Sequence, residues 1–200
     1  AFDQLEVSIP KKLNDVDLIN FTAQCLVDKN IVAWFNGRYE FGPRALGSRS
    51  FLADPRNDNI RDEINDKIKK RELFRPFAPS VIKEECHNFF DIKQESPYMN
   101  IVANVHEDKK KIIPAITHID GTARVHSVSF ESNPMYYNLL KKFGEETGIP
   151  VLLNTSFNIQ EPIVRSPTDA IQTFLNSGVD LLVIGNYICD IKWKNENLAK

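Results

Sequence analysis

Arginines and glycines alternate in one stretch of the chain, residues 37–50, which holds three of each. Guanidinium groups match the oxygens of phosphates, and glycines let backbone N–H groups approach an anion closely. The stretch therefore predicts an anion contact. A solvated loop in which Glu40 pairs with an arginine is the alternative, because short Gly/Arg stretches are common in turns.

A second basic cluster spans residues 67–77 and contains Arg71 and Arg75. If an amphipathic helix persists through the cluster, both arginines lie on its apolar face, where a cation needs an anionic partner. Phe74 and Phe77 then enclose Arg75 in an apolar frame. The alternative is a basic helix end that complements the helix dipole.

Short polar side chains recur in a third region. Asn154, Ser156 and Asn158 alternate, so on an extended chain they share one face and form a plausible ligand wall. The segment 118–124, which ends in Arg124, has the same mixture of strand-like and small polar residues. Turn capping is the alternative for both segments.

Other chemistries find no support in the motifs. The chain has no Gly-x-x-x-x-Gly-Lys-Ser/Thr phosphate loop and no Gly-x-Ser-x-Gly elbow. Its four histidines lack metal-ligand spacing, so no metal site is predicted. The three cysteines form no Cys-x-x-Cys pair, which indicates reduced thiols and a cytoplasmic protein.

The composition fits one globular domain over residues 1–200, with 42% hydrophobic and 26% charged residues. A formal net charge of -2 provides no overall field for nucleic acid or an anionic membrane. No apolar run approaches the roughly 20 residues that span a bilayer. We expect neither a membrane partner nor a nucleic-acid partner.

Helical and strand-like patterns alternate along the chain. Residues 15–27 predict a helix, 31–35 a buried strand, and the spacing of Ile60, Ile64 and Ile68 a second amphipathic helix. Further strands are expected around 50–52, 81–82, 99–105, 123–127, 151–153 and 181–184, and further helices at 134–147 and from Ser166 to about residue 177. Such alternation indicates an α/β domain with a largely buried sheet.

Four motifs together resemble the C-terminal signature of the O-carbamoyltransferases, the family of the nodulation-factor, cephalosporin and tobramycin enzymes. In chain order they are EFGPRALG at 40–47 with DPR at 54–56, KKRELFRPFAPS at 69–80, HIDGTAR at 118–124, and NTSFN at 154–158. The motif-bearing part covers about residues 31–185.

The resemblance implies a YrdC-like fold, a twisted, mixed β-sheet flanked by helices, with a concave basic face. It implies binding of ATP, with Mg²⁺, and of carbamoyl phosphate. The reaction that the resemblance implies begins with hydrolysis of carbamoyl phosphate to carbamate, which then attacks the α-phosphate of ATP to give carbamoyl adenylate. The partner implied is an N-terminal actin-like domain, outside these 200 residues, which carbamoylates the acceptor.

Carried over by motif, the resemblance assigns phosphate charge to three catalytic cations and further ligand contacts to five residues. The catalytic cations are Lys69, Arg75 and Arg124, and the ATP- or substrate-binding residues are Arg44, Arg71, Asn154, Ser156 and Asn158. One departure is a glycine that the family places before Glu-Pro-Ile-Val and that is missing here before Glu161. This shortens the turn beside Ser156.

Two other functions remain open. YrdC-like folds also handle RNA, and the basic cluster at 67–75 offers a grip for a phosphate backbone, although no aromatic stacking platform accompanies it. The chain is also compatible with a non-catalytic docking half of a carbamoyltransferase.

Overall fold

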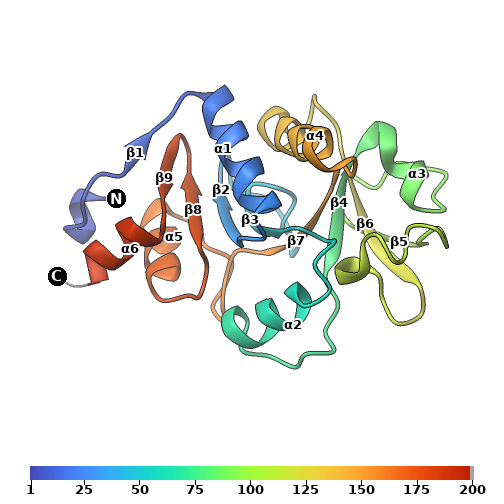
Figure 1. Cartoon of the computed structure of the whole chain (residues 1–200). Helices are drawn as coiled ribbons and strands as arrows, with labels where there is room; N and C mark the ends of the chain where they lie inside the picture. The colour runs from blue at the N-terminus through green and yellow to red at the C-terminus, as the bar shows by residue number, and fades with distance from the viewer. Residues whose placement is uncertain (199–200) are drawn as a thin grey trace.

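A mixed sheet of nine strands forms the centre of the computed structural model, which describes residues 1–198 (Figure 1). The strand order is β1-β9-β8-β2-β3-β7-β4-β6-β5. The pairs β2–β8 and β4–β6 are parallel, and the other neighbours are antiparallel. The strands are β1 (Lys11–Lys12), β2 (Val32–Phe35), β3 (Arg49–Ala53), β4 (Ala78–Ile82), β5 (Ile101–Asn104), β6 (Thr122–Val128), β7 (Val151–Ser156), β8 (Leu181–Ile184) and β9 (Tyr187–Cys189).

Helices cover both faces of this sheet. The α-helices of the described residues are α1 (Asp15–Val27), α2 (Ile60–Glu63), α3 (Cys86–Phe89), α4 (Pro134–Thr147), α5 (Pro167–Leu175) and α6 (Ile191–Leu198). A π-helical turn, Ile64–Ile68, continues α2, and short 3-10 turns lie at Asp3–Leu5, Lys83–Glu85 and Pro114–Ile116. The predicted α/β class, with a mixed sheet flanked by helices, is confirmed.

The pleat of the central strands builds a separate core on each face. In β2, Val32 and Trp34 pack among residues of α1 and α4, whereas Ala33 and Phe35 pack on the opposite side against residues of α2 and α5. Figure 1 shows α1 and α4 together above the sheet and α2 below it. Because all four side chains are buried, β2 carries no polar alternation and reads as a continuous apolar run.

Capping residues set the ends of the longer helices where the sequence predicts them. The side chain of Asn133 accepts a hydrogen bond from Tyr136 N at the start of α4, which ends at Gly148 with a φ of +75°. Ser166 and Asp169 form a reciprocal capping box at the start of α5. The predicted helices at 15–27 and 134–147 are confirmed.

The helix that begins at Ile60 does not extend as far as Arg75. It ends after the π turn at Ile68, and Lys70 adopts a left-handed φ of +47° that turns the chain away. The expectation that Arg71 and Arg75 extend an apolar helix face is therefore wrong. Both belong to the irregular loop that leads into β4.

No helix among residues 1–198 combines the length and apolar character that a bilayer crossing requires.

Candidate functional site

Three of the predicted arginines line one small pocket of about 120 Å³. Arg44 comes from the loop between β2 and β3, Arg71 from the loop before β4, and Arg124 from β6. Asn154 and Ser156 line the same pocket from the end of β7, and none of its described lining residues is acidic. Burial lowers the pKa of Arg124, and the charge of Arg44 lowers it further. A pocket of this charge favours an anionic ligand.

The loop that carries Arg44 is shaped by a buried carboxylate. Oε1 of Glu40 accepts hydrogen bonds from the backbone N–H of Leu46 at 2.6 Å and of Ser48 at 2.7 Å. Burial raises the pKa of Glu40, while these two bonds and the charge of Arg49 act in the opposite direction. Glu40 thus clamps the loop through its backbone, and the alternative in which it pairs directly with an arginine is not what the structure shows.

Two further contacts fix the same loop. The guanidinium of Arg49 stacks on the ring of Phe35 at 3.5 Å and donates to the carbonyl of Gly37. Gly47 has a φ of +93°, and a Cβ there would lie 2.0 Å from Cδ1 of Tyr136. Because only glycine tolerates both conditions, the loop approaches α4 more closely than another residue would allow.

A buried asparagine orients Arg71. Asn65 is fully buried; its Oδ1 accepts from Nε of Arg71 at 2.7 Å, and its Nδ2 donates to the carbonyls of Leu73 and Arg75 at 3.2 and 3.0 Å. The guanidinium of Arg71 also lies 5.0 Å from the ring centroid of Phe77. Asn65 therefore closes the loop and directs one arginine of the pocket at once.

Lys69 lies beside the pocket but does not line it. Its Nζ contacts four oxygens of Ser156 and Asn158, two backbone and two side-chain, at 2.5 to 3.3 Å. Burial, then repulsion by Arg71, lowers the pKa of Lys69 to about 7, while Glu161 acts in the opposite direction. The Nζ of Lys69 is thus hydrogen-bonded to protein oxygens, and it holds the turn after β7.

Arg75 lies at the outer end of the site. It pairs with Glu72 at 2.9 Å, half of its side chain is exposed, and Phe74 is 73% exposed. The expected apolar frame around Arg75 is therefore absent. Arg75 shares a neighbouring pocket of about 270 Å³ with Arg71 and Arg124, so it reaches the same groove from outside.

The polar residues that were predicted to share one face at the end of β7 take different positions in the structure. Asn154 is 1% exposed and points, like Ser80, to the face covered by α4, where its Nδ2 donates to Ser80 Oγ and to the carbonyl of Ala45, each at 2.9 Å. Ser156 ends the strand, and Asn158 follows it and lies outside the pocket. Of the three residues of the predicted wall, Asn154 and Ser156 line the pocket and Asn158 does not.

The shortened turn after Asn158 is internally satisfied. The carboxylate of Glu161 accepts from the backbone N–H groups of Ile159 and Gln160, each at 3.0 Å, and from the hydroxyl of Thr173 at 3.1 Å. Nδ2 of Asn158 donates to the carbonyl of Glu161 at 2.6 Å. The missing glycine leaves none of these polar groups unpaired.

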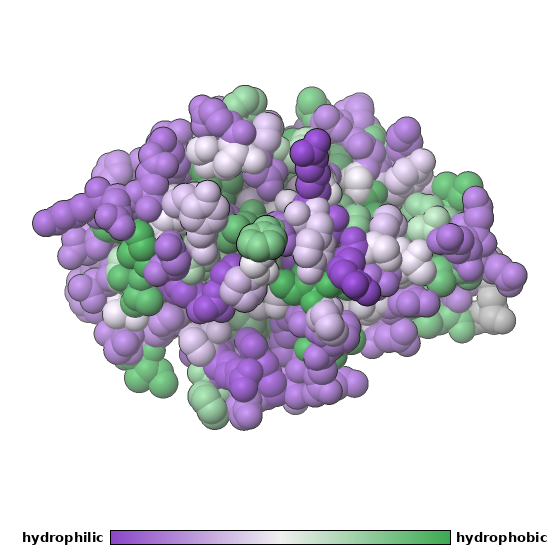
Figure 2. All heavy atoms as spheres, turned by 180° about the vertical axis from the view of Figure 1, so that it is seen from behind, coloured by the Kyte–Doolittle hydropathy of each residue, from purple (hydrophilic) through white to green (hydrophobic). Residues whose placement is uncertain are grey.

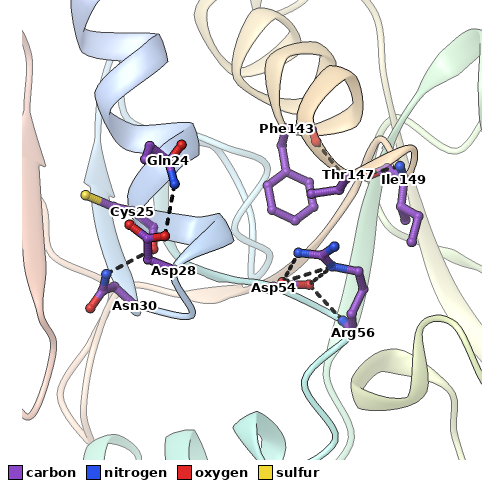
Figure 3. Close-up of polar contacts among 9 residues, drawn as sticks. All are labelled: Gln24, Cys25, Asp28, Asn30, Asp54, Arg56, Phe143, Thr147 and Ile149. Carbon is purple, nitrogen blue, oxygen red and sulfur yellow. Dashed lines mark hydrogen bonds and ion pairs between the residues drawn. The ribbon is translucent and has the colours of Figure 1, made fainter.

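The DPR segment at 54–56 stays outside the pocket. Asp54, which is 2% exposed, accepts from Nη2 of Arg56 at 2.6 Å, and the Arg56 guanidinium lies 5.6 Å from the ring of Phe143 on α4 (Figure 3). This pair joins the end of β3 to α4. The pair therefore supports the packing around the site and takes no part in the pocket itself.

The pockets merge into one groove. The pocket of Arg75 shares Pro76 and His118 with a third pocket of about 320 Å³, whose wall includes the exposed Phe74 and Ile119. Seen from behind, green hydrophobic side chains lie between strongly hydrophilic ones near the middle of the molecule (Figure 2). The groove therefore passes from a cationic end to a more apolar end.

Nothing in residues 1–198 resembles a resident metal centre or a reactive thiol. No group of three His, Cys, Asp or Glu residues in that range is placed to hold a metal ion. Cys25, Cys86 and Cys189 are unpaired, and burial raises the pKa of Cys25 and Cys86 to about 11. Burial also raises the pKa of Cys189, so all three remain protonated thiols near neutral pH.

A family model described as "Carbamoyltransferase C-terminus" matches residues 23–190. The chain belongs to this family. The nodulation protein NolNO of Sinorhizobium fredii is 48% identical over 176 residues, which cover 86% of this chain and 26% of that protein. The 3'-hydroxymethylcephem-O-carbamoyltransferase of Amycolatopsis lactamdurans is 38% identical over 162 residues, which cover 80% of this chain and 31% of that protein. The resemblance carried by the four motifs is confirmed, and the chain spans about a quarter to a third of these relatives' length.

Solved structures of other proteins share the fold of this carbamoyltransferase C-terminal domain. Sua5 of P. abyssi, complexed with L-threonine, superimposes with a TM-score of 0.63 at 14% identity, covering 90% of this chain and 50% of that one. Full-length HypF in its phosphate- and nucleotide-bound form gives 0.58 at 20% identity, covering 88% of this chain and 22% of that one. The predicted YrdC-like fold is confirmed.

The sequence analysis did not identify two features that organise the pocket of the carbamoyltransferase domain. One is Asn65, and the other is the role of Glu40 as an acceptor that clamps the loop backbone. Asn65 sits between Ile64 and Ile68, so a polar residue in a buried helical turn was the available signal. Its partners, the carbonyls of Leu73 and Arg75, lie beyond the helix end and could not be inferred from helical spacing.

Proposed function

We propose that this domain binds ATP and carbamoyl phosphate and joins their parts into carbamoyl adenylate. The observation that carries the proposal is the pocket in which Arg44, Arg71 and Arg124 meet without any acidic partner in the described lining. Both substrates are polyanions, and adenylation spreads further negative charge over the reacting phosphate. Preorganised guanidinium groups stabilise that charge without reorganisation during the reaction.

A second feature favours a ligand that also carries an N–H donor. Oδ1 of Asn154 is buried and has no hydrogen-bond partner among residues 1–198, and Asn154 is one of the residues that line the cationic pocket. An unsatisfied buried acceptor costs about 1–3 kcal/mol, which a donor on the ligand would recover. Carbamoyl phosphate and carbamate offer an NH₂ group next to anionic oxygens, and inorganic phosphate does not.

The chemistry requires no protein nucleophile. Hydrolysis of carbamoyl phosphate releases phosphate and leaves carbamate, one oxygen of which attacks the α-phosphorus of ATP. The bond from the α-phosphorus to the bridging oxygen then breaks, and pyrophosphate leaves. Arg44, Arg71 and Arg124 would hold the phosphates in line, and Ser156 would contact a ligand oxygen from the end of β7.

The pocket offers magnesium no ligand set of its own, because its described lining is cationic and amide-bearing. Magnesium prefers oxygen ligands and commonly enters nucleotide sites on the substrate phosphates. In this proposal Mg²⁺ arrives with ATP and is held by ATP, while the arginines neutralise the remaining charge.

Delivery of the carbamoyl group belongs to another part of the protein. The chain corresponds to the C-terminal part of longer relatives, of which it covers 26% and 31%. We propose that an actin-like N-terminal domain receives the adenylate and carbamoylates the acceptor hydroxyl, completing an O-carbamoyltransferase.

The proposal is tested by exchange of labelled pyrophosphate into ATP, with and without carbamoyl phosphate. We expect exchange that depends on Mg²⁺ and is strengthened by carbamoyl phosphate. Calorimetry with ATP accompanies the assay, so that weak binding and weak chemistry are told apart. Absence of both exchange and ATP binding would refute adenylation by this domain.

A further inference from the structure

Two of the motif segments contain large apolar side chains that the proposed function leaves unused. Phe74, in the segment 69–80, is 73% exposed, and Ile119, in the segment 118–124, is 95% exposed. Both line the pocket of about 320 Å³ that forms the more apolar end of the groove. A single exposed apolar side chain needs no explanation, but two that converge on one pocket indicate a binding site.

This pocket shares its wall with the cationic part of the groove. The middle pocket, of about 270 Å³, has Arg71, Phe77 and Arg124 in common with the arginine pocket. It has Pro76 and His118 in common with the pocket of Phe74. A ligand whose anionic end lies among the arginines can therefore extend past Pro76, which lines all three pockets, into the apolar end.

Hydrogen bonds fix the backbone that carries Phe74. Nδ2 of Asn65 donates to the carbonyls of Leu73 and Arg75, the residues on either side of Phe74, at 3.2 and 3.0 Å. The backbone N–H of Arg75 also donates to the carbonyl of Glu72 at 3.2 Å. The position of Phe74 is thus set by its own loop before any ligand binds.

The turn that carries Ile119 is closed in a similar way. The N–H of His118 donates to the carbonyl of Thr122 at 2.8 Å, and the N–H of Gly121 donates to the carbonyl of His118 at 2.9 Å. Oδ1 of Asp120 accepts from the N–H and the hydroxyl of Thr122 at 3.0 and 2.7 Å. Because both apolar side chains stand on hydrogen-bonded turns, a ligand between them has little backbone left to order.

The remaining wall combines apolar surface with polar groups. Pro76 and Ala115 add apolar surface, and Arg61, Thr117 and Asp120 add hydrogen-bonding groups. A purine base has two apolar faces, which stack on aromatic side chains, and a polar edge. Carbamoyl phosphate has no apolar part, so ATP is the one of the two proposed substrates that suits both ends of the groove.

We infer that the pocket of Phe74 and Ile119 holds the adenosine of ATP, with the base against the ring of Phe74 and the triphosphate among the arginines. The inference rests on the proposed function, because it takes ATP as the ligand of the arginine pocket. It adds a base-binding subsite and two residues that contact the nucleoside.

The test compares ATP with inorganic tripolyphosphate, which has three linked phosphates and no nucleoside. Dissociation constants of both, as magnesium complexes, are measured by calorimetry. Phe74→Ala should weaken ATP binding roughly 5- to 150-fold, the range that base stacking on an aromatic side chain covers, and change the affinity for tripolyphosphate less than about threefold. Ile119→Ser should follow the same pattern with a smaller loss for ATP. Both side chains are exposed, so both variants should fold.

Phe130→Ala is the matched control. Phe130 is 50% exposed and lines none of the three pockets of the groove, so its loss should change neither affinity more than about threefold. Phe74→Trp reports contact directly, because the chain's own Trp34 and Trp193 are only 0% and 7% exposed. ATP should quench the fluorescence of the exposed indole, and tripolyphosphate should leave it unchanged.

Different failures have different meanings. Full ATP affinity and continued pyrophosphate exchange in Phe74→Ala would overturn the base subsite and leave the proposed function standing. Equal losses for ATP and tripolyphosphate in Phe74→Ala would mean that the arginine loop has moved, and would also overturn the contact with the base. If the unaltered chain binds tripolyphosphate but not ATP, the subsite falls while the anion pocket stands. If it binds neither, the proposed function falls with the inference.

Discussion

Replacing Arg124 by methionine should separate ligand binding from folding, because the two respond in opposite directions. Methionine keeps an unbranched apolar stem of similar length and removes the guanidinium. Arg124 forms no ion pair with any residue in 1–198, and its buried Nε has no hydrogen-bond partner there. Its charge also faces that of Arg44, which helps to lower its pKa.

The magnitudes follow from these contacts. Loss of one charge-assisted hydrogen bond to a phosphate costs about 1.5–3 kcal/mol, which weakens affinity for ATP roughly 10- to 150-fold. In the free domain the substitution removes a partly desolvated cation from a cationic pocket and breaks no described contact. We expect the melting temperature of Arg124→Met to stay level or rise by up to about 4 °C, the shift that corresponds to roughly 1 kcal/mol at this chain length.

Calorimetry with ATP and thermal unfolding are measured on the same preparations of Arg124→Met and of Lys70→Met. Lys70 is exposed and outside the pocket, so its loss controls for a simple change in net charge and should alter affinity less than about threefold. A fall in the melting temperature of Arg124→Met, with unchanged ATP affinity, would refute the reasoning and make Arg124 a structural residue. Equal losses of affinity in both variants would mean that the effect is one of net charge.

Three further outcomes test the frame of the site. Gly47→Ala places a Cβ 2.0 Å from Tyr136 at a φ of +93°, so the free energy of unfolding should fall by roughly 2–4 kcal/mol in chemical denaturation. Gly148→Ala, with a φ of +75° and no atom within 4 Å of the added Cβ, should cost only about 1–2 kcal/mol, and equal costs would mean that the Tyr136 contact relaxes freely. Asn65→Ala removes a buried amide that donates to the carbonyls of Leu73 and Arg75, so it should cost about 1–3 kcal/mol and weaken ATP binding as well; normal binding would show that the arginine loop holds its shape alone. Burial and a neighbouring arginine lower the pKa of Lys69 from 10.5 to about 7 in the folded chain. Between these two pH values the unfolded chain therefore holds one more proton, on Lys69, than the folded chain. The free energy of unfolding, taken relative to that of Lys69→Met, should rise with pH across that window by at most about 1.4 kcal/mol per pH unit. A flat difference would mean that the four surrounding oxygens keep the ammonium charged.

Local patterns suffice where a segment's own residues decide its structure. Periodicity and caps determine the helices Asp15–Val27 and Pro134–Thr147, since Asn14, Asn133 and Gly148 satisfy the helix ends from within a few residues. The four motifs determine the family, because their residue types and order are specific without any knowledge of contacts. The terminal strands β1 and β9 lacked such a signal, because two or three residues cannot show a period and they form only by pairing with each other and with β8.

Only the tertiary structure decided which environment each of three neighbouring cations occupies. Lys69, Arg71 and Arg75 lie within seven residues of one another in the sequence, and their side-chain types do not distinguish them. The left-handed turn at Lys70 and the buried Asn65 send them to three environments: a cage of oxygens from the end of β7, the pocket, and an exposed pair with Glu72. The oxygens around Lys69 and the strands that line the pocket of Arg71 lie far away along the chain, whereas Glu72 lies only three residues from Arg75. A sequence states which charges are present, but the desolvation and the partners that set what a charge does arise only when distant segments pack together.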